Sequence, residues 1–164
     1  MRKRIIGTAQ ARSDVVAPIV VSNDDTWLDL ENIAAVEVSS EDPAFPVEAI
    51  FDATAESGWR AAEDGEQLVR IIFDEPAPLH RIQVQFVEKE IERTQQFTLR
   101  WSQALGAPAH EIVRQQWTFS PQGSTREVEQ YAVSLERVAV LELSIRPDLN
   151  AGRGRATLLN WRVG

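Results

Sequence analysis

Few residues in this sequence have the types and the spacing that catalysis needs. Cysteine is absent and the only histidines are His80 and His110, so thiol chemistry is excluded and a histidine-rich metal centre is disfavoured. There is no Gly-x-Ser-x-Gly nucleophile elbow, no Walker A or Rossmann glycine pattern and no His-Glu-x-x-His zinc motif. Acidic pairs such as Glu63-Asp64 are neighbours in sequence, which is typical of a solvated surface. We therefore expect a protein that is not an enzyme.

Composition and charge narrow the class of partner. The hydrophobic content of 43% suffices for one packed core. No apolar run approaches the roughly 20 residues that a membrane-spanning helix needs. The formal net charge of −8 opposes the counterion release that drives binding to nucleic acids. The basic start Met1-Arg2-Lys3-Arg4 is not followed by an adequate apolar segment for a signal peptide. We expect a cytoplasmic protein that binds neither nucleic acid nor membrane.

Alternation of apolar and polar residues recurs from about Ile33 to the end of the chain, as expected for strands with one buried face. In the segment 79–87, Ile82, Val84 and Phe86 share one face and the polar residues between them share the other. The same pattern predicts strands at 34–38, 68–73, 97–102, 113–119, 128–133, 141–145 and 158–163. Turn-rich segments separate them and no helical pattern intervenes, which favours an all-β antiparallel sandwich or barrel.

The pattern also suggests how the chain is organised. Residues 33–164 carry all of the predicted strands and are expected to form one domain. Residues 1–32 are less regular, and we expect an N-terminal arm or an edge strand packed on that domain. Neither an internal repeat nor a convincing linker divides the chain.

Several segments, in order, resemble the discoidin family, also called coagulation factor 5/8 type C domains. Residues 38–59, with Pro46, Phe51, Asp52 and Trp59 in corresponding places, are similar to the family's opening motif. The segments that resemble its later strands are 67–76, 79–84, 97–102 and 156–163. This resemblance covers about residues 33–164 and implies a galactose-binding-domain-like fold, an antiparallel jelly-roll β-sandwich.

The family resemblance also implies a function. Most members bind glycans through loops at one rim of the sandwich, so it implies a non-catalytic carbohydrate-binding module. The alternative is a protein-interaction or structural module on the same fold whose ligand site has degenerated, with a protein partner or a second copy of the chain. Phospholipid-binding members carry basic surroundings, which a chain of charge −8 lacks.

A structural calcium ion is common at one end of the family's sandwich. Carried over by position, Asp52 matches the first aspartate of the calcium loop and Ser57 matches its threonine, whereas Thr54 replaces the second aspartate and Asn160 the glutamate near the carboxyl end. Calcium prefers several carboxylate and carbonyl oxygens. With two carboxylates replaced, an occupied calcium site and a loop closed by hydrogen bonds both remain open.

A sugar site on such a fold needs an aromatic ring for the apolar face of the sugar and planar polar groups for its hydroxyls. Most tryptophans fit the core, because Trp101, Trp117 and Trp161 fall on the apolar parity of their strands and Trp59 matches a structural tryptophan of the family. Trp27 stands apart: if residues 27–30 form a strand, it turns away from the two leucines and could stack on a sugar, or it caps the end of the sandwich. The polar candidates are His110, Arg114, Arg153 and Arg155, each of which also fits a solvated loop.

Overall fold

The computed structural model describes residues 1–7, 27–151 and 154–164. Its elements are, in chain order, β1 (Arg2–Ile5), α1 (Leu30–Ile33), β2 (Ala34–Val38), the 3-10 helix η1 (Val47–Phe51), β3 (Trp59–Asp64), β4 (Gln67–Val87), β5 (Arg93–Ser102), β6 (His110–Phe119), β7 (Arg126–Arg146), β8 (Arg155–Leu158) and β9 (Asn160–Val163). Each strand predicted from the sequence lies within one of these strands or overlaps it. The predicted all-β sandwich is confirmed.

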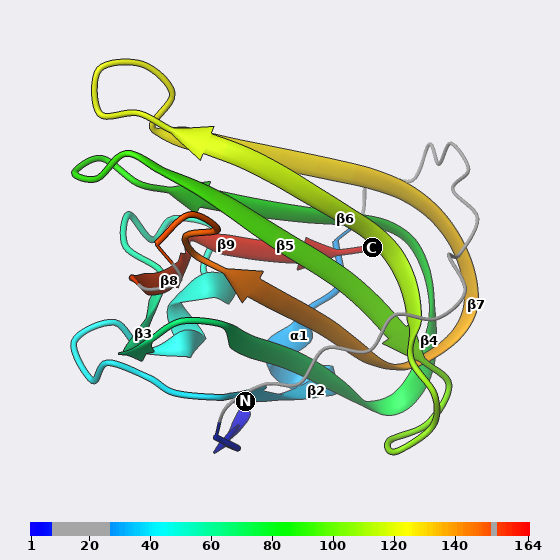
Figure 1. Ribbon diagram of the computed structural model, residues 1–164. Coiled ribbons are helices and arrows are strands. Elements are labelled where there is room, and N and C mark those ends of the chain that lie inside the picture. Colours follow the sequence, from blue (N-terminus) through cyan, green and yellow to red (C-terminus); the bar gives the residue numbers. More distant parts are fainter. Residues whose placement is uncertain (8–26, 152–153) are drawn as a thin grey trace.

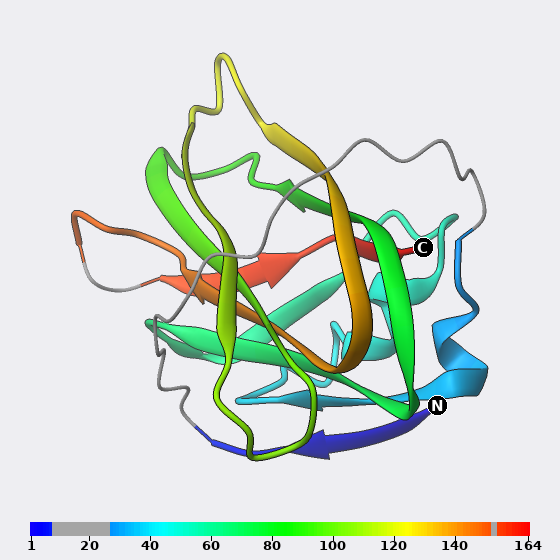
Figure 2. The ribbon, with the colours of Figure 1, turned by 90° about the vertical axis from the view of Figure 1, so that its right-hand side faces the viewer.

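Two long strands, β4 and β7, connect the layers of the sandwich (Figures 1 and 2). Residues 67–72 of β4 pair with residues 140–145 of β7, and after irregular register between Ile72 and Arg81 the strands pair again, residues 81–87 with 126–132. The first half of β4 and the second half of β7 lie in the path β1-β2-β4-β7-β5-β6, while the second half of β4 also pairs with β9. The β-bulges between the two halves let the strands bend from one layer into the other.

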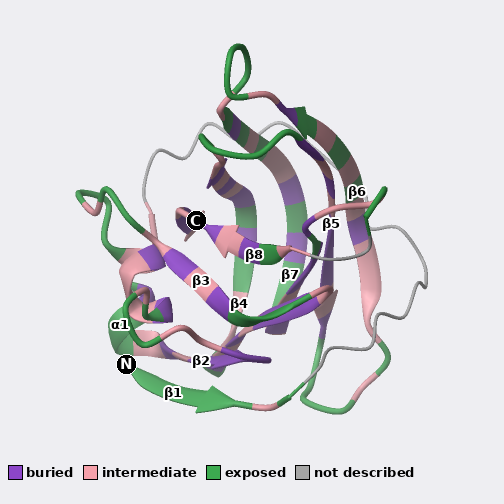
Figure 3. Ribbon diagram, turned by 60° about the vertical axis from the view of Figure 1, so that its left-hand side comes forward, coloured by how far each residue is buried: buried purple, intermediate pink, exposed green. Residues whose placement is uncertain are grey.

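The core lies between the layers and is built by the inward parity of each strand. Ile82, Val84 and Phe86 are fully buried, as the alternation predicted, and Phe97 and Leu99 meet them from β5. Figure 3 shows the same alternation as buried and exposed bands along the strands. Burying large apolar side chains at about 25 cal/mol per Å² is the main force that holds such a sandwich together.

The predicted core positions of the tryptophans are confirmed for Trp59 and Trp161, which are 1% exposed. Trp117 of the edge strand β6 and Trp101 at the end of β5 pack against the core but are only half-buried.

The N-terminal part of the chain differs from the strand considered for residues 27–30. Residues 27–29 have no regular structure and Leu30 begins the short helix α1. Arg2–Ile5 forms β1, which pairs in parallel with β2 at the edge of the first sheet (Figure 2). The boundary between residues 32 and 33 stays a prediction. No helix among the described residues has the length and apolarity to cross a membrane.

Candidate functional site

A hollow of about 310 Å³ opens at one rim of the sandwich, where four loops meet. We call it the rim hollow; it is lined by Phe45 and by residues 56–60, 87–90 and 157–159. Its volume falls within the range of about 300–1,000 Å³ that is common for small-molecule sites. The rim hollow is therefore large enough for a sugar residue.

Phe45 reaches the rim hollow because its loop is tied to the start of β3. The backbone N–H of Asp42 donates to Arg60 O at 2.9 Å, and the N–H of Arg60 donates to Phe45 O at 3.2 Å. The Arg60 guanidinium then lies 4.1 Å from the centre of the half-buried Phe45 ring. One face of the ring is occupied by this contact, so the other face or the edge lines the hollow.

Arg60 is itself held by an acid. Its Nε and Nη2 donate to Asp42 Oδ2 at 3.1 and 2.6 Å, a two-point contact that fixes the planar guanidinium. The hydrogen bond from Arg60, with that from the backbone N–H of Ala44, holds the pKa of Asp42 below its ordinary value. Asp42 is thus ionised at neutral pH and keeps Arg60 over the ring.

The polar lining of the rim hollow is mainly acidic. Glu56, Glu88 and Glu90 contribute carboxylates, against one lysine, Lys89, and the already paired Arg60. Glu88 is partly engaged, with Oε1 3.3 Å from Arg93 Nε. Carboxylates accept hydrogen bonds from hydroxyl groups and repel anions. The rim hollow can therefore bind a polyol that lacks negative charge.

The floor of the rim hollow is fixed by a close backbone approach. A Cβ atom on Gly58 would lie 2.0 Å from Leu158 O, so only glycine fits there. The next residue, Trp59, donates its indole N–H to Ser40 O at 3.0 Å and is buried. These contacts place residues 56–60 firmly against β8.

The loop expected to hold calcium lies beside this floor and is closed by its own hydrogen bonds. Thr54 donates to Asp52 Oδ1 through its backbone N–H at 2.9 Å and its hydroxyl at 2.8 Å, which lowers the pKa of Asp52. Buried Asn160 donates from Nδ2 to Ile50 O at 2.9 Å. Ser57 is exposed and lines the rim hollow.

These contacts favour a loop closed by hydrogen bonds over an occupied calcium site. Asp52 is the one carboxylate among the four predicted ligands, and the Asn160 amide already donates a hydrogen bond to the carbonyl of Ile50. Among the described residues, no group of three or more acidic, histidine or cysteine side chains is arranged to hold a metal ion. Calcium binding at Asp52, Thr54, Ser57 and Asn160 stays a prediction.

The predicted ligand-binding residues are spread over the molecule instead of gathering at one site. Trp27 is half-buried with the Arg81 guanidinium 3.6 Å from its ring centre, so one of its faces is already occupied. The His110 ring lies 5.2 Å from that of Trp101 at the start of β6. Arg155 pairs with Asp42 at 3.4 Å, beside Arg60.

The other two predicted ligand-binding residues are Arg114 and Arg153. Arg114 lies on the outward face of the sheet and contacts Glu111 at 2.8 Å. It lines a separate, arginine-rich hollow. Arg153 lies outside the described residues. Their roles in binding stay predictions.

One buried acid has a strongly raised pKa. Burial, reinforced by the neighbouring Glu129, raises the pKa of Glu127 to about 8. Glu127 pairs across strands with the core residue Phe86 and faces the interior. It lines neither the rim hollow nor the arginine-rich one, so it does not present a proton to a ligand bound there.

The architecture and its loop-built hollow define a galactose-binding-like β-sandwich, and solved structures share it. One is the CBM32 module of AlyQ in complex with 4,5-unsaturated mannuronic acid, with 13% identity, a TM-score of 0.62, and coverage of 85% of this chain and 98% of that chain. Residues 28–134 match the family described as the XRCC1 N terminal domain, and the chain belongs to that family.

Two further structures extend the comparison. A pectin binding carbohydrate binding module has 19% identity and a TM-score of 0.58, and the match covers 81% of this chain and 91% of that chain. A CBM32 module from Clostridium perfringens in complex with GalNAc-beta-1,3-galactose has 13% identity and a TM-score of 0.59, covering 84% and 99%. No curated protein matches the sequence. The predicted galactose-binding-like jelly roll is confirmed, while membership of the discoidin family stays a prediction.

The main aromatic residue of the rim hollow, Phe45, was not among the sequence candidates. A signal for it exists, because Phe45 stands between Pro43 and Pro46 in a segment without strand alternation. An aromatic residue in a proline-rich loop has no strand partner to bury it, so it is a candidate for a surface site.

Proposed function

We propose that the protein is a non-catalytic carbohydrate-binding module and that the glycan binds in the rim hollow. The observation that carries this proposal is a partly exposed aromatic ring, Phe45, in a concave site between loops, surrounded by hydrogen-bonding side chains. Several proteins with this fold are carbohydrate-binding modules, among them those solved with an unsaturated mannuronic acid and with GalNAc-beta-1,3-galactose.

The chemistry of the lining favours a neutral sugar. The free part of the Phe45 ring suits the apolar C–H face of a pyranose. Glu56 and Glu90 are exposed and can accept hydrogen bonds from sugar hydroxyls, and Lys89 can donate one. A sugar carboxylate would meet the acidic lining. The sheets act as a rigid support and the ligand is released unchanged.

An array of neutral and acidic glycans, followed by titration with the best binder, tests the proposal. We expect a neutral glycan to bind, and Phe45→Ala to weaken it by about tenfold, on the scale of one aromatic contact. Leu105→Ala is the matched control, since Leu105 is 62% exposed and lines no part of the rim hollow.

A second pair of variants addresses the polar lining. Glu56→Gln removes a charge from the rim hollow, and Glu136→Gln removes one from an exposed position of β7. Only the first should change glycan affinity. If the array shows no binding, or if both control variants weaken binding as much as the rim variants, the proposal is wrong.

The alternative, a protein-interaction or structural module, has no observation in its favour among the described residues. It predicts a silent glycan array together with specific capture of one protein from cell extract.

A further inference from the structure

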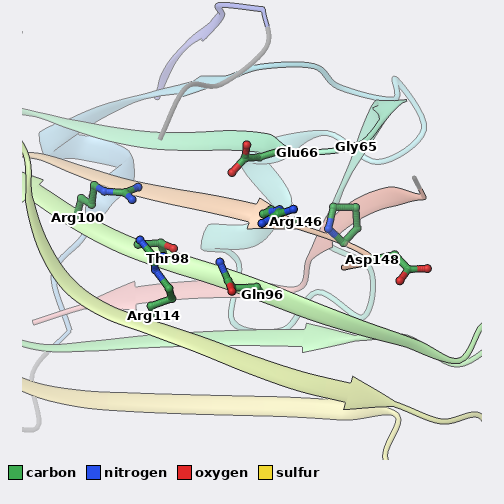
Figure 4. Close-up of a pocket in the computed structure, with 9 residues that line it drawn as sticks. Gly65, Glu66, Gln96, Thr98, Arg100, Arg114, Arg146 and Asp148 are labelled. Carbon is green, nitrogen blue, oxygen red and sulfur yellow. The ribbon is translucent and has the colours of Figure 1, made fainter. Parts of the chain in front are cut away.

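A second hollow, of about 340 Å³, lies on the outward face of the first sheet (Figure 4). We call it the arginine hollow. Gln96, Thr98 and Arg100 of β5 and Arg114 of β6 line it, and the turns at residues 65–66 and 146–148 close its sides. Unlike the rim hollow, it is walled mainly by side chains that project from neighbouring strands.

The strand register explains why three arginines meet there. Arg114 of β6 lies directly across from Thr98 of β5, and Arg146 of β7 lies across from Gln96. Arg100 follows Thr98 by two positions and therefore projects from the same face. Directly opposed residues have Cβ atoms about 5 Å apart, so the three guanidinium groups surround Thr98 and Gln96.

Arg100 also belongs to a row of alternating charge that crosses six strands in register. The row runs Arg4, Glu37, Arg70, Glu142, Arg100, Glu111 from β1 to β6. Its ion pairs include Glu37 with Arg70 at 3.1 Å and Arg70 with Glu142 at 3.3 Å. The row balances its own charge, with three arginines against three glutamates.

Positive charge is in slight excess among the residues that line the arginine hollow, because three arginines, Arg100, Arg114 and Arg146, stand against two acids, Glu66 and Asp148. Glu66 is one of the two lining acids and accepts a hydrogen bond from Ser144 at 3.2 Å. Asp148 accepts from the backbone N–H groups of Asn150 and Ala151, and Figure 4 shows its carboxylate directed away from the arginines. In a chain of net charge −8, this local excess favours an anion.

The burial and the hydrogen bonding of Arg100 are the most direct indication that the arginine hollow binds a ligand. It is 1% exposed, its Nε has no hydrogen-bond partner among the described residues, and the ion-pair contact of its Nη2 with Glu111 is long, at 3.9 Å. An unsatisfied buried donor is costly, and an unpartnered guanidinium N–H even more so. Burial lowers the pKa of Arg100, although the nearby Glu111 carboxylate opposes the shift.

The floor between the arginines offers further donors. Gln96 accepts from Gln116 Nε2 through its Oε1 at 3.1 Å, so the N–H₂ of Gln96 is left to donate toward the hollow. The Thr98 hydroxyl lies next to it. Guanidinium groups bind planar carboxylates at two points, and amide and hydroxyl groups can hold the remaining oxygens.

We propose that the arginine hollow is a second binding site, for a monosaccharide-sized ligand that carries one carboxylate, such as a hexuronate. The charge excess is small, which suits a monoanion better than a phosphate dianion. This site is separate from the rim hollow, so this proposal and the proposed function can fail independently.

Titration of the full chain with sodium glucuronate, and with its neutral methyl ester, tests the proposal. We expect saturable binding of glucuronate that weakens as salt is added, and no binding of the ester. Arg146→Ala should weaken glucuronate binding by about tenfold or more, the scale of a charge-assisted hydrogen bond. Arg137→Ala, an exposed arginine of the same strand outside the arginine hollow, should leave it unchanged.

Thr98→Val keeps the shape of a buried side chain and removes one donor, so it should fold normally and weaken glucuronate binding a few-fold. Phe45→Ala should have no effect on this ligand. The proposal is overturned if glucuronate does not bind, if Arg137→Ala weakens binding as much as Arg146→Ala, or if inorganic phosphate competes as well as glucuronate does.

Discussion

The rim hollow and the arginine hollow have similar volumes, about 310 and 340 Å³, but they are built and charged differently. Loops wall the rim hollow, and its lining carries an aromatic ring, three glutamates and an arginine already paired with Asp42. The arginine hollow is formed by side chains of three paired strands and has an arginine, Arg100, with an unpartnered Nε.

The two hollows are therefore shaped by different parts of the same sandwich, one by contacts between loops and the other by the pairing of strands. In the rim hollow, backbone contacts between loops place the lining side chains, so its shape depends on a few close approaches. In the arginine hollow, the sheet register places them, and the hydrogen-bonded strands hold the spacing of the arginines. The first should be sensitive to backbone changes, and the second to changes of charge.

Gly58→Ala should give the largest effect, because it attacks the backbone contact under the rim hollow. The new Cβ would lie 2.0 Å from Leu158 O, so β8 must move or the loop must detach. We expect the free energy of unfolding to fall by about 3 kcal/mol, measured by chemical denaturation.

Gly123→Ala is the matched control. Its Cβ would meet only the Ser120 side chain, at 3.7 Å, which is an ordinary contact. It should change stability by less than about 1 kcal/mol. Equal effects of the two substitutions would contradict the close approach at Gly58.

The strands that carry both hollows could be predicted from the sequence. Alternation placed Ile82, Val84 and Phe86 on the buried face, and the structure confirms it. Burial on one face is a local property of a strand, so it leaves a pattern of period two. Trp27 shows the limit, because its partner Arg81 is 54 positions away and no local pattern reveals that stacking.

The binding groups themselves could be predicted only in part. Arg114 was a candidate, but Arg100 and Arg146 were not, since what unites the three is the register of β5, β6 and β7. Register depends on which strands pair, and alternation within one strand does not record it. The aromatic candidate from the sequence was Trp27, whereas the aromatic residues that line the rim hollow are Phe45 and the buried Trp59.

Glu127 sharpens the comparison, because it is a buried ionisable residue like Arg100, beside Glu129 and Gln95, but lines neither hollow. Its pKa is raised from 4.5 to about 8 in the folded protein. The unfolded chain therefore loses this proton first, and the stability of the wild type decreases as pH rises from about 4.5 to about 8.

Glu127→Gln removes that titration. The free energy of unfolding of the variant minus that of the wild type should be larger at pH 8 than at pH 5, by at least about 1 kcal/mol. Glu136→Gln, on an exposed position of the same strand, should show no such difference. Chemical denaturation of both variants at the two pH values measures this difference. Equal pH dependence of the two variants would contradict a raised pKa of Glu127.

Measuring the affinity of each variant for both ligands tests whether the two hollows bind independently. Phe45→Ala should weaken the neutral glycan by about tenfold and spare glucuronate, and Arg146→Ala should do the reverse. Arg146→Ala should not change the melting temperature by more than about 2 °C, because Arg146 is exposed, whereas Phe45→Ala also removes the contact of a half-buried ring with Arg60 and should lower it more. If each variant weakened both ligands, the two hollows would belong to one continuous site.

Adding or removing calcium should give the smallest effect, a negligible change in melting temperature. The result shows what holds the loop beside the rim hollow in place. In the loop beside it, Asp52 already accepts two hydrogen bonds from Thr54, and Asn160 already donates to Ile50 O. A ligand that binds only the folded state raises the melting temperature. We expect melting curves in calcium chloride and in chelator to coincide. A higher midpoint with calcium would mean that a cation, and not the Asn160 amide, fastens this end of the sandwich, and the rim hollow would then depend on an ion that the arginine hollow does not need.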